Sequence, residues 1–133
     1  MSELFSDDWA RAYMVAWNLD DDITSTLKAA GFSSVVAFGF PDDDDHPSFV
    51  MTIDNGVVTS VDKKPEDVID WDIRATKENW VTLIAKPPGL MKLGIAYTHR
   101  QIRFKKGDYA AMLKDPSLAG AFVRSFVLMG KVT

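Results

Sequence analysis

The stretch from residue 49 to residue 61, FVMTIDNGVVTSV, limits most strongly what this chain can fold into. Residues 49–53 alternate between two sets of side chains with the period of two that a half-buried strand requires. The turn Asp54-Asn55-Gly56 follows directly, and Asn-Gly between two such runs is the strongest short-range signal for a β-hairpin. Residues 57–61 supply the return strand. The middle of the chain therefore predicts an antiparallel strand pair.

Helical patterns occupy both ends of the chain. Trp9, Tyr13 and Trp17 recur every four residues, which places them on one face of a helix. A second helix follows an acidic run, and we expect a helical pair within residues 1–31. Residues 117–130 predict a C-terminal helix that is apolar around much of its circumference.

Further strands are predicted at 33–40, 69–74 and 101–105, with helices after residue 76 and over residues 90–97. The expected order is α-α-β-β-β-β-α-α-β-α-α. Because strands cluster in the middle and helices gather at the ends, the pattern favours an α+β fold with helices on one face of the sheet. One strand follows a helical crossover, so we expect a five-stranded, mostly antiparallel mixed sheet.

Composition narrows the function further. The chain has 133 residues, 47% of them hydrophobic, which fits a single domain over residues 1–133. It has no cysteine, which excludes disulfides and thiolate chemistry, and its net charge of −4 argues against binding to nucleic acid. No apolar run reaches the roughly 20 residues of a membrane span. Neither a secretory signal nor a peroxisomal ending is present, so we expect a cytoplasmic protein.

Few residues suggest chemistry. The acidic loop Asp42–His46 could bind a hard cation, but it lacks the spacing of a calcium loop, and a solvated hairpin loop is the better interpretation. Asp70 and Asp72 share one face of strand 69–74, which we expect to lie in water together with Arg74. His99 has no orienting carboxylate nearby in sequence. We therefore expect no catalytic residue, no metal and no cofactor.

The run Lys105-Lys106-Gly107-Asp108 joins a strand to a helix. A phosphate cradle is one interpretation, because backbone amides at a helix N-terminus bind anions. However, Asp108 stands at the expected N-cap, where its own carboxylate accepts those amides. We interpret the run as a structural corner, and contact of the two lysines with a CoA phosphate or an acidic lipid headgroup is the lesser alternative.

Three segments resemble the sterol carrier protein family. Residues 70–80 resemble the strand, polar cap and helix in the middle of that family, and residues 96–113, with their Gly-Asp corner, resemble its later strand and helix. Residues 118–122 fall where the family places its C-terminal helix. By order of elements the resemblance covers about residues 33–130. The tryptophan-bearing N-terminal helix and the missing peroxisomal ending are departures that suit a stand-alone bacterial-type member.

The resemblance implies an apolar tunnel between the sheet and the helices, capped by the C-terminal helix, and non-catalytic binding or transfer of a fatty acid, fatty acyl-CoA, sterol or similar lipid. Flexible methionines and aromatic side chains suit such walls. The residues that we predict to contact the ligand are Trp80, Leu83, Ile84, Met91, Ile95, Phe104, Met112, Phe122, Phe126 and Met129.

Two alternatives stay open at this stage. The first is an accessory subunit whose apolar face meets a partner enzyme. The second is a small isomerase-like enzyme of a catabolic pathway, which would need Asp70, Asp72 or His99 inside an apolar cavity with a shifted pKa. The sequence leaves the ligand and the oligomeric state open, a dimer included.

Overall fold

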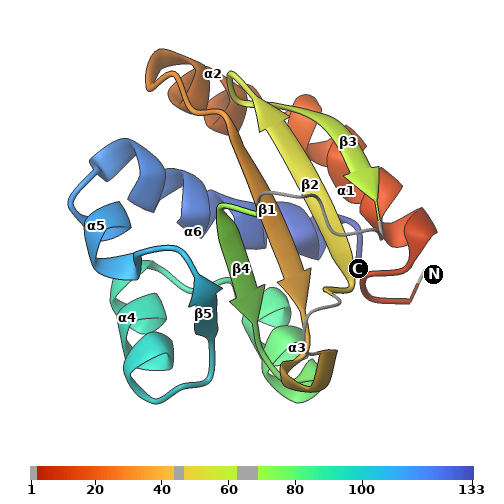
Figure 1. Cartoon of the computed structure of the whole chain (residues 1–133), viewed down its shortest axis with the longest axis vertical. Coiled ribbons are helices and arrows are strands. Elements are labelled where there is room, and N and C mark those ends of the chain that lie inside the picture. The colour runs from red at the N-terminus through yellow and green to blue at the C-terminus, as the bar shows by residue number, and fades with distance from the viewer. Residues whose placement is uncertain (1–2, 44–46, 63–68) are drawn as a thin grey trace.

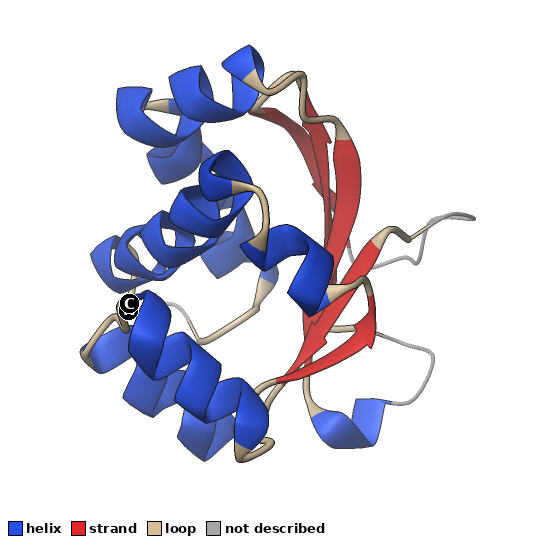
Figure 2. Cartoon of the chain, turned by 90° about the vertical axis from the view of Figure 1, so that its left-hand side faces the viewer, coloured by secondary structure: helices blue, strands red, loops and turns tan. Residues whose placement is uncertain are grey.

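Five strands form one sheet, and six α-helices pack against a single face of it, as Figure 1 and the side view in Figure 2 show. The computed structural model describes residues 3–43, 47–62 and 69–133. The predicted α+β class, the five-stranded mixed sheet and the order of elements are confirmed, with one short 3-10 helix added at Pro41–Asp43.

The first two helices are α1 (Asp7–Asn18) and α2 (Asp21–Ala29), which occupy the segment predicted to be a helical pair. Asp20 caps α2, because its carboxylate accepts the backbone N–H of Ile23 at 3.1 Å. The same carboxylate receives two hydrogen bonds from Arg124 of α6, at 2.7 and 3.0 Å. One side chain therefore begins α2 and ties the helical pair to the C-terminal helix.

The sheet contains β1 (Ser34–Gly39), β2 (Phe49–Asp54), β3 (Val57–Asp62), β4 (Trp71–Arg74) and β5 (Arg103–Lys106), in the order β3-β2-β1-β4-β5. The predicted hairpin joins β2 to β3. Its two turn residues have positive φ angles, 48° at Asn55 and 86° at Gly56, as a type I′ turn requires. A side chain at Gly56 would also lie 2.6 Å from the carbonyl oxygen of Thr24 in α2.

The parallel pair that makes the sheet mixed lies where the sequence did not place it. We expected the strand after the helical crossover to supply it, yet β5 runs antiparallel to β4, and β4 runs parallel to β1. Asp70 fixes this pairing at its start. Its backbone N–H donates to the carbonyl of Val35, and its carboxylate accepts the N–H of the same residue, both at 2.9 Å.

The remaining helices are α3 (Lys77–Ala85), α4 (Leu90–Thr98), α5 (Tyr109–Leu113) and α6 (Pro116–Lys131). Helix α6 lies in the middle of the helical layer and contacts α1, α2, α3, α4 and α5. The core lies between the layers, and its largest fully buried side chains include Trp9, Trp80, Phe49 and Phe126. The helix that was predicted over 117–130 therefore contacts every other α-helix of the layer.

Asp72 and Arg74 correct one prediction. We expected this face of β4 in water, but both residues are 4% exposed. The guanidinium of Arg74 donates to both carboxylate oxygens of Asp72, at 2.6 and 3.0 Å, and to the carbonyl of Phe40 at 3.0 Å. Alternation assigned the face correctly, because both side chains lie opposite the helical layer. It missed their burial, because the period of a strand does not show whether other segments cover that face, and the two charged groups satisfy each other.

Candidate functional site

An apolar cavity of about 70 Å³ lies between the sheet and the helical layer. Its floor is the helix-facing side of β1, β2, β4 and β5, and its roof comes from α1, α2, α5 and α6. The lining residues are Trp17, Leu27, Phe32, Val36, Phe38, Met51, Ile53, Trp71, Ile73, Phe104, Met112, Leu118, Ala121, Phe122 and Ser125.

The polar groups of this lining are already engaged. The hydroxyl of Ser125 donates to the carbonyl of Phe122 at 2.6 Å, as is common for serine inside a helix. The indole N–H of Trp17 donates to the carbonyl of Gly56 at 2.9 Å. No residue of the lining carries a charge. The cavity can therefore recognise a molecule by burying apolar surface, and the side chains of Trp17 and Ser125 offer no free hydrogen-bond donor to a buried headgroup.

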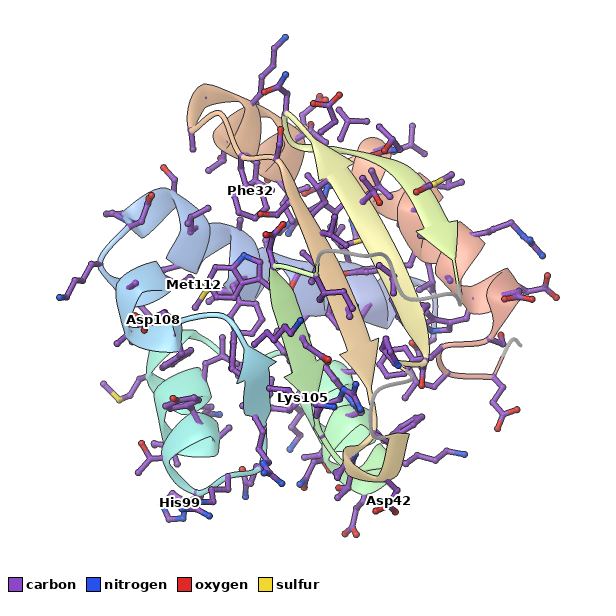
Figure 3. The ribbon with its side chains drawn as sticks, viewed as in Figure 1. Phe32, Asp42, His99, Lys105, Asp108 and Met112 are labelled. Atoms are coloured by element: carbon purple, nitrogen blue, oxygen red, sulfur yellow. The ribbon has the colours of Figure 1, made fainter. Side chains whose placement is uncertain are left out.

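One end of the cavity reaches the surface. Phe32, Trp71, Phe104, Leu118 and Phe122 line it but are only partly buried, unlike the lining residues deeper between the layers. Figure 3 shows Phe32, which precedes β1, and Met112 of α5 on the same side of the molecule. We call these five partly buried side chains the rim.

The Lys-Lys-Gly-Asp corner forms part of the rim's support. The carboxylate of Asp108 accepts the N–H of Ala111 at 3.1 Å, which confirms the predicted N-cap of α5. Gly107 has a φ of +99°, and a side-chain carbon built on it would lie 2.2 Å from Cε3 of Trp71. Only glycine lets the backbone turn there and rest on the indole ring. The corner thus places α5, and with it Met112, over the cavity.

Aromatic contacts hold α5 to its neighbours. Tyr109 stacks on Tyr97 of α4, with ring centroids 4.1 Å apart, and its ring centroid lies 5.3 Å from that of Phe104. The hydroxyl of Tyr109 is buried without a hydrogen-bond partner among the described residues. Burial, with a smaller contribution from Tyr97, raises the pKa of Tyr109. Helix α5 is therefore held by ring packing rather than by polar contacts of this side chain.

The ten predicted ligand contacts divide into three groups. Phe104, Met112 and Phe122 line the cavity. Met91 and Ile95 point outward, with 83% and 53% of their surface exposed. The other five are buried in the core outside the cavity lining: Trp80, Leu83, Ile84, Phe126 and Met129.

Sequence reasoning missed most of the lining. The alternation that predicted β2 and β4 already placed Met51, Ile53, Trp71 and Ile73 on one face, and that signal could have found them. Phe32 follows the end of a helix and belongs to no periodic pattern, so only the three-dimensional structure identifies it.

The residues considered for catalysis lie elsewhere. Asp70 and His99 are exposed, and Asp72 is buried on the face of β4 that points away from the helices. Of the acidic loop 42–46, residues 44–46 lie outside the described part of the chain. Among the described residues, no group of three or more histidine or acidic side chains could hold a metal ion. In the same part of the chain, no helix has the length and apolar character needed to cross a membrane.

Comparison with solved structures identifies proteins that share this fold. No protein-family model matches the sequence, and no curated protein matches it. Among solved structures, the crystal structure of sterol carrier protein 2 superposes with a TM-score of 0.72 at 20% identity, over 98% of this chain and 100% of the other. The chain has the sterol carrier protein 2 fold.

Two further structures share the sterol carrier protein 2 fold with this chain. One is the solution structure of a conserved hypothetical protein from Thermus thermophilus, with a TM-score of 0.67, 20% identity, and coverage of 98% of this chain and 90% of that one. The other is a UbiJ-SCP2 ubiquinone synthesis protein, with a TM-score of 0.64, 10% identity, and coverage of 95% and 91%. The predicted resemblance to sterol carrier proteins is confirmed at the level of the fold.

The comparison also corrects one expectation. We predicted that the tryptophan-bearing N-terminal helix departs from the sterol carrier pattern. The match to sterol carrier protein 2 spans 98% of the chain, so α1 belongs to the shared fold. Its three aromatic side chains, Trp9, Tyr13 and Trp17, are buried against the sheet and α6, which explains why the fold needs this helix.

Proposed function

We propose that this chain binds and transfers a hydrophobic ligand, such as a fatty acid, fatty acyl-CoA, sterol or similar lipid, between its sheet and its helical layer, without catalysing a reaction. The observation that carries the proposal is the cavity itself, whose lining is apolar, bears no charge and opens at an apolar rim. Its place in a fold shared with sterol carrier protein 2 supports the same conclusion.

The size of the cavity defines how a ligand would enter. At about 70 Å³ it is smaller than the roughly 300–1,000 Å³ of typical ligand pockets. Binding a lipid chain therefore requires the cavity to widen. Met112 is an unbranched side chain that adapts its shape, and it sits on α5, a helix of five residues that follows the glycine of the corner. Movement of α5 and of the start of α6 is the simplest way to move the side chains of the rim apart.

The energy of binding would come from burial. Each buried CH₂ contributes about 0.8 kcal/mol, so a chain of about 16 carbons gains roughly 13 kcal/mol before costs. The loss of ligand freedom and the opening of the rim oppose this by several kcal/mol, which leaves micromolar affinity. Since the lining side chains carry no charge, and those of Trp17 and Ser125 offer no free hydrogen-bond donor, the headgroup of such a ligand would stay at the rim or outside it.

The enzyme alternative has no support from the cavity. Its lining contains no carboxylate, histidine or lysine, and the three candidate residues Asp70, Asp72 and His99 are absent from it. An isomerase needs such a group at the substrate, with a pKa matched to proton transfer. The accessory-subunit alternative predicts a fixed partner enzyme and no bound lipid.

Lipid analysis tests the proposal. Native mass spectrometry and solvent extraction of freshly purified protein should reveal adducts of lipid mass, and the protein should bind a fluorescent fatty acid. Ala121→Phe fills the cavity, because Ala121 lines it, and should weaken binding at least tenfold. Ala29→Phe, at an exposed position at the end of α2, is the matched control and should not. A clean apo spectrum together with no binding of the fluorescent fatty acid would overturn the proposal.

A further inference from the structure

The charges of this chain are divided between two regions. Residues 86–114 contain seven basic residues and one acidic residue, Asp108, for a net charge of +6. The rest of the chain contains eight basic and 18 acidic residues, for a net charge of −10. The acidic total of −4 therefore hides a strongly basic segment, which comprises α4, β5 and α5 together with the connections around them.

The same segment exposes large apolar side chains. On α4, Leu93 and Ala96 face the core, so Met91 and Ile95 occupy the opposite, outward face, where a helix in water normally carries polar groups. They are 83% and 53% exposed. Three more of the exposed large apolar residues of the described chain belong to this segment: Leu90, Tyr97 and Leu113.

The helices that carry these side chains share one side of the molecule. Tyr97 of α4 stacks on Tyr109 of α5 and contacts Phe104 of β5, which fixes the three elements to one another. They lie together at the left of Figure 1, on the side that faces the viewer in Figure 2. All seven basic residues of this segment are exposed, and four of them lie in or near α4 and α5: Lys86, Lys92, Arg100 and Lys114. We call Leu90, Met91, Ile95, Leu113 and these four basic residues the α4–α5 face.

We propose that the α4–α5 face docks on the surface of a lipid bilayer that contains anionic phospholipids. Apolar side chains that protrude beside lysines and arginines match such a surface. The apolar groups enter the region between headgroups and acyl chains, and the cations meet the negative surface potential. The positive charge of the α4–α5 face thus complements the negative charge of the bilayer surface. The proposal depends on this face alone and does not depend on the apolar cavity.

Two other occupants fit less well. A second copy docked face to face would bring two segments of net charge +6 together, and their repulsion opposes association. A protein partner usually anchors in a pocket or groove. Here Met91 and Ile95 stand on the outward surface of a helix, and neither lines the apolar cavity.

The docking face is adjacent to the cavity. Met112 lines the cavity, while its neighbour Leu113 is 37% exposed on the α4–α5 face. Insertion of this face into a bilayer would therefore act on the helix that closes the cavity.

Vesicle sedimentation tests the docking. The intact chain should bind vesicles of phosphatidylcholine and phosphatidylglycerol in about 0.1 M salt, and bind pure phosphatidylcholine vesicles at least tenfold more weakly. Raising the salt to about 0.5 M should weaken binding, because screening shortens the reach of the charges. Met91→Glu/Ile95→Glu should reduce the affinity for anionic vesicles at least tenfold. Lys86→Gln/Lys92→Gln/Lys114→Gln, which leaves the apolar residues in place, should do the same.

The matched control is Val15→Glu/Leu19→Glu, which adds the same charge at two apolar positions that are 54% and 78% exposed on the acidic part of the chain. It should change vesicle binding less than twofold. Equal binding of the intact chain to both kinds of vesicle, or to neither, would overturn the proposal, as would an equal effect of the control. Size-exclusion chromatography decides about a second copy: a dimer that Met91→Glu/Ile95→Glu dissociates would show a self-interface instead. Circular dichroism confirms that each variant is folded.

Discussion

Replacing Gly107 by alanine tests the corner that supports the rim of the cavity. An alanine at φ +99° is strained by about 1–3 kcal/mol. Its methyl carbon would also lie 2.2 Å from Cε3 of Trp71, far inside the ~3.5–4.0 Å of a normal carbon contact, so the indole must move. That movement disturbs the edge contact between Trp71 and Phe104, with centroids 6.0 Å apart, which is worth about 0.5–1.5 kcal/mol. We expect Gly107→Ala to lower the free energy of unfolding by roughly 2–4 kcal/mol.

Urea unfolding followed by circular dichroism measures this loss of stability. Two further sets of variants separate the backbone strain from the clash with the indole ring. Gly120→Ala is the control, since this glycine lies inside α6 with no atom within 4 Å of a new methyl group, and it should stabilise the protein by about 0.5–1 kcal/mol. In a Trp71→Leu background the indole clash is gone, so Gly107→Ala should cost at least about 1 kcal/mol less. An equal cost in both backgrounds would refute the contact between residue 107 and Trp71, and no loss of stability in Gly107→Ala would refute the whole account.

Two further predictions concern single polar groups. Hydrogen bonds from Arg124 hold the pKa of Asp20 below its usual value of 3.8, so this carboxylate stabilises the fold above that pH and loses its contribution as the pH falls through the lowered value. Asp20→Asn keeps the helix cap but loses the ion pair, and should cost about 1–2 kcal/mol at pH 7 and progressively less in urea titrations toward pH 3. Tyr109→Phe removes a buried hydroxyl that has no partner among the described residues, so thermal unfolding should show no loss of stability or a gain of about 1 kcal/mol. A clear loss for Tyr109→Phe would reveal an unseen hydrogen bond.

The local signals in the sequence proved sufficient for the elements. The Asn55-Gly56 turn, and Asp20 and Asp108 as caps of α2 and α5, act through contacts between residues a few positions apart. Such contacts depend on the local backbone alone, so the residue types reveal them without knowledge of the rest of the fold. The element order and the α+β class follow from these signals together with the hydrophobic periods.

The pairing of distant strands could not be obtained in this way. Alternation shows which residues of β4 share a face, but β4 could pair with β3 beside it in sequence or with β1. The observed parallel pairing with β1 makes β4 an inner strand, and its Asp72 and Arg74, which the sequence alone placed in water, are buried. Burial of two charges depends on a partner and on covering segments, and neither is encoded in the period of the strand.

The candidate site shows the same division between what local sequence signals reveal and what depends on tertiary packing. The sequence by itself determined that this chain has a surplus of apolar side chains on its helices and strands, and that the Gly107-Asp108 corner leads into a helix. Only the tertiary structure decided which apolar residues line the cavity and which meet solvent. Met112 and Met91 both belong to apolar helical stretches, yet the first lines the cavity and the second is 83% exposed. The reason is that a helix with apolar residues on several sides does not specify which side packs, so the packing of its neighbours makes that choice.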